Sequence, residues 1–252
     1  MRKIVIALLL VAFMASPAFA LFQNGGFETG DLSGWDLYYG YNYNGPGTIT
    51  WGTTPHSTTP GVWTASSTMS GQTLKVNPYN GTYMARINDI DGNYHATKIT
   101  QTDQITQQDI DDGATLYVNW GAMLIEPSNA HDAASQPFFG IDVIIGGSTV
   151  GTFYADALTK QGGGWVLAGY NYGDLWYKSG TFAFNLASYA LGTDVTVSMY
   201  VADCAWGGHG GYAFLDGIGT SYQPPTNGVP EPTTMLLLGL GLVGLATLRK
   251  KF

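Results

Sequence analysis

The chain has 252 residues and a formal net charge of −8, and this charge is unevenly distributed. Five of the ten basic residues lie in the first three and last four positions, so residues 21–228 carry 17 acidic side chains against five basic ones. A surface this acidic argues against binding to nucleic acid or to anionic lipid, because both need Lys or Arg to neutralise phosphate.

Asp dominates the acidic residues of this middle segment, in which Glu28 and Glu126 are the two glutamates. Asp forms turns and binds hard cations, whereas the scarce Glu favours helices. The segment also holds all seven Trp and all sixteen Tyr, with many Gly, Thr and Asn. This composition predicts short strands joined by tight turns, and its aromatic and β-branched residues exclude a disordered chain.

The first 20 residues have the features of a signal peptide. Arg2 and Lys3 form a positive start, Ile4–Met14 is apolar, and Ala18 and Ala20 give the small-x-small cleavage pattern. We expect a signal helix that is removed after residue 20. An uncleaved membrane anchor is the alternative, but the apolar stretch is shorter than the ~20 residues that span a bilayer.

Alternating apolar and polar residues recur between residues 21 and 222, separated by clusters of Gly, Asn and Asp, as is typical of strands and turns. Gly146 and Gly147 stand between two such stretches and predict a hairpin. No stretch has the period of an amphipathic helix. We therefore predict one all-β domain, a jelly-roll β-sandwich large enough to bury a core without disulfides. The predicted strands are Thr48–Trp51, Thr82–Ile87, His95–Thr106, Thr115–Met123, Phe138–Ile145, Thr149–Phe153, Gly180–Phe184, Asp194–Val201 and Gly211–Gly219.

Two acidic clusters, Asn88–Asn93 and Asp109–Gly113, have the composition of a calcium-binding loop. The first lacks the spacing of an EF-hand and the Glu that closes such a loop. We interpret both clusters as turns between strands.

Cys204 is the single cysteine, which excludes an intramolecular disulfide and, in our interpretation, a cysteine-based zinc site. Free cysteine is among the most buried residue types, so we expect Cys204 to be buried. The alternative is a thiol that pairs with a second chain.

The histidines do not indicate catalysis. His209 lies in a glycine-rich stretch, but no G-x-S-x-G motif accompanies it, and His56, His95 and His131 form no H-x-x-x-H pair. We expect His209 to pack locally. A glycoside hydrolase would need two carboxyl groups facing one sugar bond, and no such pair stands out, since Glu126 precedes a proline in an apparent loop. We therefore expect a protein that is not an enzyme.

Aromatic residues gather in two stretches, of which the first runs from Trp35 to Tyr43. The second follows three glycines and is interpreted as a long loop, where binding residues usually lie. Exposed Trp and Tyr rings stack on the apolar faces of sugars. Packing of the same rings in a sandwich core is the alternative. The candidate carbohydrate-binding residues of the second stretch are Trp165, Tyr170, Tyr172, Trp176 and Tyr177.

Two further segments resemble known domains. Asn24–Trp35 reads N-G-G-F-E-T-G-D-L-S-G-W, which resembles the opening of carbohydrate-binding-module-like and galactose-binding-like jelly rolls. Asp203–Ile218, which ends in Leu-Asp-Gly-Ile, resembles their closing strand. The resemblance implies that the first and last strands lie side by side.

The same resemblance implies a structural Ca²⁺ at the edge of these strands. It would be held by Glu28 and Asp216, with Asp31 as a further ligand, and carboxylates and carbonyls are the ligands that Ca²⁺ prefers. Gly217 stands where many of these domains have a second Asp, which removes one ligand. The alternative is that these carboxylates bind backbone amides at strand ends.

The C-terminal residues form an ordered set of parts after the linker Gln223–Gly228. An apolar run, Met235–Leu248, would give a helix of about 24 Å if it begins at Thr233, shorter than the ~30 Å hydrocarbon core. A basic cluster follows, which favours a cytoplasmic end. Residues 229–252 resemble the PEP-CTERM sorting signal, whose parts are here Val229, Pro230, Glu231 and Pro232, the apolar run, and Arg249, Lys250 and Lys251. An ordinary tail anchor is the alternative.

The sorting-signal resemblance implies recognition by an exosortase, a membrane protease-transferase that cuts near Pro-Glu-Pro, in a Gram-negative host that makes extracellular polysaccharide. The chain would cross the inner membrane, be held there transiently, and end at the cell surface or outside the cell. Our first hypothesis is an exported, non-catalytic domain that binds extracellular polysaccharide in a biofilm. The second is a structural domain that binds other proteins, and the third is a secreted glycoside hydrolase.

Overall fold

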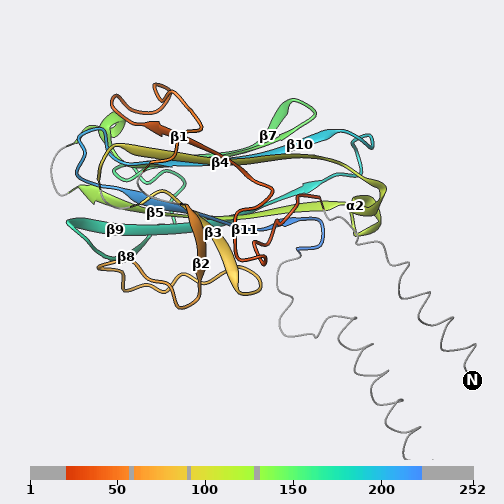
Figure 1. Cartoon of the computed structure of the whole chain (residues 1–252), viewed down its shortest axis with the longest axis horizontal. Helices are drawn as coiled ribbons and strands as arrows, with labels where there is room; N and C mark the ends of the chain where they lie inside the picture. The colour runs from red at the N-terminus through yellow and green to blue at the C-terminus, as the bar shows by residue number, and fades with distance from the viewer. Residues whose placement is uncertain (1–20, 57–59, 90–91, 128–130, 223–252) are drawn as a thin grey trace, which may run out of the picture. The chain divides into compact units, whose positions relative to one another are not determined.

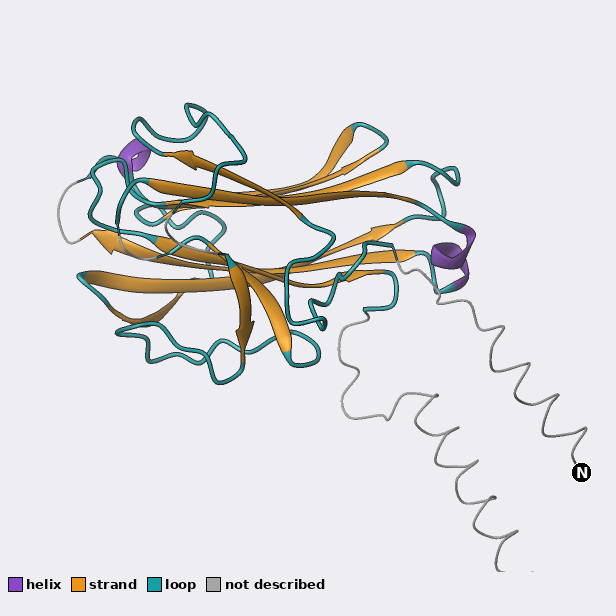
Figure 2. Cartoon of the chain, viewed as in Figure 1, coloured by secondary structure: helices purple, strands orange, loops and turns teal. Residues whose placement is uncertain are grey.

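The computed structural model describes residues 21–56, 60–89, 92–127 and 131–222, and the chain divides into two units, 1–222 and 223–252. The first unit contains two antiparallel sheets stacked face to face, as Figures 1 and 2 show. One sheet has five strands in the order β1 (Asp36–Tyr41), β4 (His95–Gln104), β10 (Asp194–Ala202), β6 (Phe138–Ile145) and β7 (Ser148–Asp156). The other has six, in the order β2 (Gly61–Thr64), β3 (Tyr83–Ile87), β11 (Gly211–Gly219), β5 (Thr115–Pro127), β9 (Gly173–Asn185) and β8 (Val166–Tyr170). The prediction of an all-β sandwich is confirmed.

The main core lies between the two sheets and follows from the alternation of side chains along each strand. In β5, Leu116, Val118 and Trp120 face inward, and in β10 Val195 and Val197 face them from the other sheet. The Trp120 ring lies 4.6 Å from the ring of Phe153 and 5.2 Å from that of Phe139. All core residues of the described part lie between residues 21 and 218, so residues 21–222 carry their own hydrophobic core.

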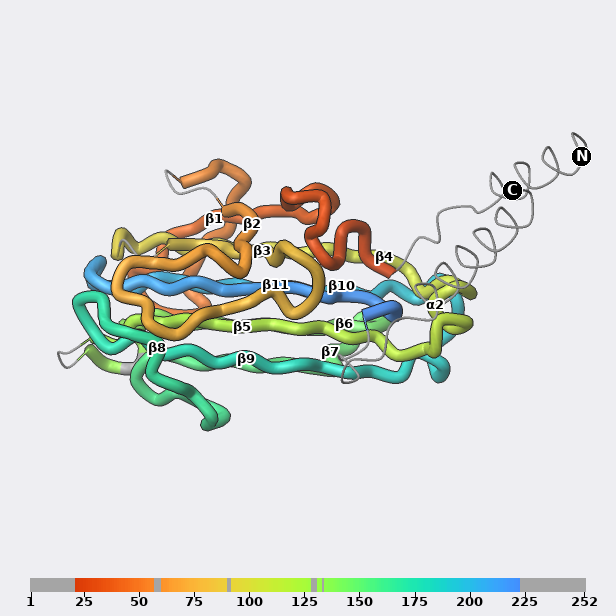
Figure 3. The backbone as a smooth tube through the Cα atoms, turned by 90° about the horizontal axis from the view of Figure 1, so that it is seen from below, coloured from red at the N-terminus to blue at the C-terminus, as the bar shows by residue number. Residues whose placement is uncertain are grey.

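A second hydrophobic cluster covers the outer face of the six-stranded sheet. Trp63, Met123 and Phe214 point outward from their strands and are buried by Met69 and Val76 of the segment that joins β2 to β3. Figure 3 shows this segment, in orange, lying across the sheet. The outer face of the five-stranded sheet is more open, because β4 and β10 alternate between buried and partly exposed residues. An accessible groove is therefore expected on the five-stranded sheet.

Turn chemistry fixes one hairpin that the sequence predicted. Gly146 and Gly147 join β6 to β7 with φ angles of 58° and 78°, a left-handed conformation that glycine adopts without strain. The flanking pair is Ile145 and Ser148, so the register matches a two-residue turn. The predicted bounds of β6 and β11 are the observed ones.

Several predicted elements differ from the structure. Thr48–Trp51 is not a strand, and a single bridge between Tyr39 and Gly52 follows it. The acidic stretch 109–113 belongs partly to a short helix, α2 (Gln107–Asp111), which begins with a capping box between Thr106 and Asp109. Glu126 lies in β5 rather than in a loop.

The second aromatic stretch also differs, because it forms β8 and the first half of β9 instead of a long loop. Leu175 and Tyr177 of β9 pack on the second hydrophobic cluster, and this packing extends the strand. The described part also contains a 3₁₀ turn at Ala133–Ser135.

The N-terminal segment lies against the last strand, although β1 and β11 are in different sheets. The amide of Ile218 donates to the carbonyl of Gly25 at 3.0 Å, and Phe22 and Phe27 are buried beside Trp35. The adjacency that the jelly-roll resemblance implied therefore involves residues before β1, while β1 itself pairs with β4.

Candidate functional site: an aromatic groove on the five-stranded sheet

Strand register aligns the floor of a groove on the outer face of the five-stranded sheet. Tyr200 of β10 lies between Lys98 of β4 and Gly140 of β6. Two residues along β10, on the same face, Ser198 has Asp142 of β6 as its neighbour. Residues far apart in the sequence thus form two adjacent rows.

The side chain of Tyr200 lies across β6, and glycine at position 140 makes this possible. A Cβ atom at Gly140 would lie 2.1 Å from Cζ of Tyr200, which no real pair of atoms allows. The end of the Tyr200 ring therefore occupies the space above Gly140 that a side chain would fill. Burial, and next the Asp142 carboxylate, raise the pKa of Tyr200, so its hydroxyl stays protonated at neutral pH.

Trp51 forms a wall of the groove, held by the loop that follows β1. Two backbone hydrogen bonds of 2.8 Å join Tyr39 to Gly52, the residue that follows Trp51, and so hold this part of the loop against β1. The Trp51 and Tyr200 rings meet edge to face, with centroids 6.4 Å apart. The Lys98 ammonium lies 5.0 Å from the Trp51 ring and 4.6 Å from the Tyr38 ring, and burial lowers the pKa of Lys98.

The groove has a volume of about 350 Å³, within the ~300–1,000 Å³ of typical ligand sites. Its lining combines an apolar part with Lys98, Asp142 and Ser198. No hydrogen bond between described residues uses the side chains of these three polar residues. The groove therefore offers a cation that donates, a carboxylate that accepts and the hydroxyls of Ser198 and Tyr200, beside the rings of Trp51 and Tyr200.

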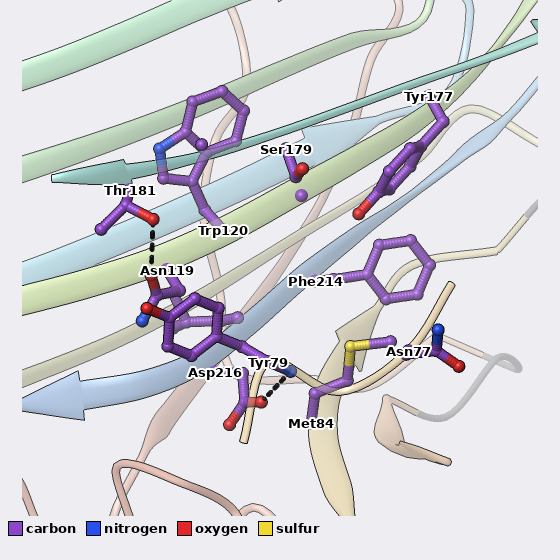
Figure 4. A pocket seen from close by; sticks show the side chains of 13 residues that line it. Asn77, Tyr79, Met84, Asn119, Trp120, Tyr177, Ser179, Thr181, Phe214 and Asp216 are labelled. Atoms are coloured by element: carbon purple, nitrogen blue, oxygen red, sulfur yellow. Dashed lines mark hydrogen bonds between the residues drawn. The ribbon is translucent and has the colours of Figure 1, made fainter. Parts of the chain in front are cut away.

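A second pocket, of about 210 Å³, lies on the six-stranded sheet between β9, β11 and the segment that precedes β3. Figure 4 shows Tyr79, Tyr177 and Phe214 around it. Asn119 in this pocket accepts from Thr181 at 2.6 Å and donates to the carbonyl of residue 217 at 2.9 Å. Nε1 of Trp120, which also lines the pocket, is buried without a hydrogen-bond partner among the described residues.

Asp216 at the edge of this pocket accepts hydrogen bonds from three backbone amides, those of Tyr79, Asn80 and Gly217, at 2.6, 3.0 and 2.7 Å. Burial raises the pKa of Asp216 to about 7, and the nearby Glu28 carboxylate adds to this, whereas the three amides act in the opposite direction.

The predicted calcium ligands lie near one another but are engaged otherwise. Glu28 accepts from the amides of Thr82 and Tyr83 at 2.9–3.0 Å, and Asp31 accepts from its neighbours Thr29 and Ser33. The carboxylates of Glu28 and Asp216 thus face N–H groups, whose positive ends disfavour a cation. These hydrogen bonds match the backbone-capping alternative, and calcium binding stays a prediction.

The predicted carbohydrate-binding residues are divided between different environments. Trp165 packs on the main core, and Trp176 donates to Glu126 at 2.6 Å, with Lys160 over its ring. Tyr177 lines the smaller pocket. Tyr170 and Tyr172, 62% and 82% exposed, remain on the surface after β8. The structure therefore does not bring the five together in one site.

Sequence reasoning missed the groove because its residues share no motif. Trp51, Lys98, Asp142 and Tyr200 come from four separate segments, and only the strand register joins them. The first aromatic stretch gave a partial signal, since Tyr38 lies beside Lys98. Cys204 is buried, as predicted.

The predicted signal-cleavage residues and the sorting residues lie outside the described part of the chain. In the part that the structure describes, no helix is long and apolar enough to cross a membrane.

The described domain is an antiparallel β-sandwich with a groove of ligand-binding size. Residues 228–251 match the PEP-CTERM protein-sorting motif, which confirms the resemblance seen in the sequence. This motif implies an exported, cell-surface protein that an exosortase processes. No curated protein matches the sequence.

Several solved structures are similar at low identity. The enzymatically active domain of tailspike protein 4 from bacteriophage CBA120 is 11% identical with a TM-score of 0.35, over 81% of this chain and 21% of that one. A carbohydrate-binding module specific for non-crystalline cellulose, CBM28, is 14% identical with a TM-score of 0.39, over 79% and 94%. The CBM27-1 module of Caldicellulosiruptor saccharolyticus, in complex with mannohexaose, is 15% identical with a TM-score of 0.32, over 66% and 99%. Similarity at this level does not transfer a function.

Proposed function

We propose that the domain binds extracellular polysaccharide through the groove on the five-stranded sheet and does not catalyse a reaction. The observation that carries this proposal is the Tyr200 ring, which lies over Gly140 and beside the Trp51 ring in the lining of the groove. Sugars have apolar C–H faces that stack on such rings, while their hydroxyl groups need both donors and acceptors. Lys98, Asp142 and Ser198 supply these groups on the floor of the groove.

The charge of the domain suggests which polymers it binds. Residues 21–228 carry a large excess of acidic side chains, and the groove itself holds one Lys and one Asp. An anionic polymer would meet repulsion on approach, whereas a neutral one would not. We therefore infer a neutral polysaccharide.

The binding test is a calorimetric titration of residues 21–222 with the host's extracellular polysaccharide and with neutral oligosaccharides. Trp51→Ala removes one of the two rings and should raise Kd about tenfold, equivalent to about 1.4 kcal/mol. Tyr172→Ala is the matched control, because Tyr172 is exposed and is one of the carbohydrate-binding residues predicted from the sequence. Loss of binding in Tyr172→Ala but not in Trp51→Ala would place the site at β8 and overturn the proposal.

For sorting, we infer that an exosortase cuts near Pro230–Pro232 and releases the domain from the inner membrane to the cell surface. Replacing Pro230, Glu231 and Pro232 by Ala should abolish processing and leave the protein in the membrane fraction. Unchanged release would contradict this inference. The test is independent of glycan binding.

Structural calcium at Glu28, Asp31 and Asp216 stays a separate prediction. If the ion binds there, Ca²⁺ should raise the midpoint of thermal unfolding and EDTA should reverse the rise. Glu28→Gln should then remove the effect. A midpoint that is unchanged by Ca²⁺ would favour the backbone-capping role that the hydrogen bonds describe.

A protein-binding role is the second candidate, favoured by one surface feature. Val166, Leu167, Tyr170 and Tyr172 of β8 and its turn are each about half exposed or more. Apolar side chains gathered in this way mark interaction surfaces. Sedimentation of the wild-type domain and of Leu167→Glu tests it, since a self-associating surface would give a concentration-dependent mass that the variant lacks.

A further inference from the structure

A group of two histidines and the single cysteine lies at the turns that connect the two sheets. His131 follows β5, Cys204 follows β10, and His209 precedes β11. Their ligand atoms all lie within 4.8 Å of one another. The sequence did not reveal this group, because the three residues form no short motif and one cysteine argued against a zinc site.

The distance between Cys204 and His209 is close to that in a tetrahedral metal centre. Sγ of Cys204 lies 3.8 Å from Nδ1 of His209. Zinc bonds of about 2.3 Å to sulfur and about 2.05 Å to nitrogen, at a tetrahedral angle, place the two ligand atoms about 3.6 Å apart. The observed separation exceeds this by only a few tenths of an ångström, so these two side chains need little movement to bind one ion, and the ligand atom of His131 lies within 4.8 Å of both.

His131 supplies an independent sign of a missing ligand. Its side chain is more than nine-tenths buried, and its Nδ1 atom has no hydrogen-bond partner among the described residues. A buried polar atom without a partner costs free energy, and a bound ion would remove that cost. Trp206 packs on the His131 ring at 4.3 Å, and the His131 and His209 rings meet at 5.4 Å.

The groups around Cys204 and His209 hold both side chains in position. The amide of Gly208 donates to Sγ of Cys204 at 3.1 Å, and the amide of Cys204 donates to the carbonyl of His209 at 2.8 Å. His209 also forms a hydrogen bond with the backbone of Tyr172. Contacts of this kind orient the ligands of metal sites and stabilise a thiolate.

His131 and Cys204 are buried, and His209 is the most exposed member of the group. His209 is partly exposed, which leaves a path for an ion to enter.

The neighbouring group of Asp89, His95 and Asp203 is already satisfied by protein partners. Asp203 accepts from the amide of His95 at 3.0 Å and from the side chain of Asn88 at 2.7 Å, and His95 lies 3.1 Å from Asp89. His56 stacks on His95 at 4.1 Å. This second group is a hydrogen-bonded network within the fold, and His56, which stacks on it, serves as the control residue below.

We propose that His131, Cys204 and His209 bind one Zn²⁺ ion, with water in the fourth position. Three protein ligands and a water satisfy the preference of zinc for tetrahedral coordination. The ion would join the β5–β6 connection, which holds His131, to the β10–β11 connection, which holds Cys204 and His209, and thereby stabilise this end of the sandwich. This site is separate from the proposed groove.

The test uses purified metal-free residues 21–222 and Co²⁺ as a spectroscopic probe for zinc. We expect one equivalent of Co²⁺ to give a thiolate-to-cobalt charge-transfer band that Zn²⁺ displaces, and Zn²⁺ to raise the thermal midpoint. Cys204→Ser should abolish the band, and His209→Gln should weaken binding at least tenfold even if Cys204→Ser folds poorly. His56→Gln should bind as the wild type does.

Absence of the charge-transfer band in the folded wild-type protein would overturn the proposal. So would full retention of Zn²⁺ affinity in both Cys204→Ser and His209→Gln. Stoichiometric binding of Cu⁺ without any binding of Zn²⁺ or Co²⁺ would overturn the assignment to zinc, because a His₂Cys set also suits copper.

Discussion

Substituting Gly140 by Ala tests the groove without removing any side chain that would contact a ligand. The added Cβ would lie 2.1 Å from Cζ and 2.2 Å from Oη of Tyr200, so the ring must leave its position on β6. The atoms in conflict belong to the end of a flexible side chain, and the ring can turn away. The stacking face beside Trp51 would then be lost while the strands remain paired.

Gly140→Ala is expected to affect both the stability of the domain and its binding of polysaccharide. Overpacking typically costs ~1–3 kcal/mol, and replacing Gly by Ala at a compatible backbone position returns ~0.4–1 kcal/mol. We therefore expect Gly140→Ala to lose up to about 2 kcal/mol of unfolding free energy. Loss of one aromatic platform should raise Kd for the polysaccharide about tenfold.

Chemical denaturation and calorimetry of the same preparations separate the two effects. Gly121→Ala is the matched control, since its Cβ would meet the Tyr177 hydroxyl at 3.2 Å in the smaller pocket instead. A folded Gly140→Ala protein that binds polysaccharide as tightly as the wild type would refute the role of the Tyr200 ring. Loss of binding in Gly121→Ala alone would move the site to the six-stranded sheet.

Two further predictions concern stability. Burial raises the pKa of Asp216 to about 7, so the native state binds this proton more tightly than the unfolded state does. The stability that the proton contributes is therefore complete below about pH 4 and is lost as the pH rises through 7. NMR titration of the Asp216 carboxyl group should give a midpoint near 7, and a midpoint near 4 would contradict the prediction. Thr106→Ala removes the capping box with Asp109 and should cost ~0.5–2 kcal/mol in urea unfolding, whereas Thr106→Ser should cost less; equal losses in both variants would argue against capping.

Local signals in the sequence predicted much of the fold. The Gly146–Gly147 turn and the alternation along β6 and β11 are consequences of short-range chemistry, and they were predicted correctly. The long β8–β9 hairpin was not, because Leu175 and Tyr177 owe their burial to the segment that joins β2 to β3. A contact between distant segments produces no periodic pattern of apolar residues from which the sequence could predict it.

The candidate sites depended still more on distant contacts. Trp51 was placed in a strand, but it lies in a loop that contacts β10, and its partner Tyr200 is defined only by strand register. The histidines form no metal-binding pair in the sequence, yet His56 stacks on His95 and His131 meets His209. In each case the fold joins residues that the sequence separates. The sorting motif, by contrast, is one contiguous segment and was recognised from the sequence.

The central claim, that the groove on the five-stranded sheet binds polysaccharide, is tested most directly by NMR of residues 21–222 with ¹⁵N-labelled tryptophan. The seven indole N–H signals would be assigned by substitution and followed during titration with a neutral oligosaccharide from the host polymer. The account predicts that the Trp51 signal shifts and saturates while the signals of Trp165 and Trp176 stay unchanged. Saturable shifts of Trp165 or Trp176 with an unmoved Trp51 would contradict it.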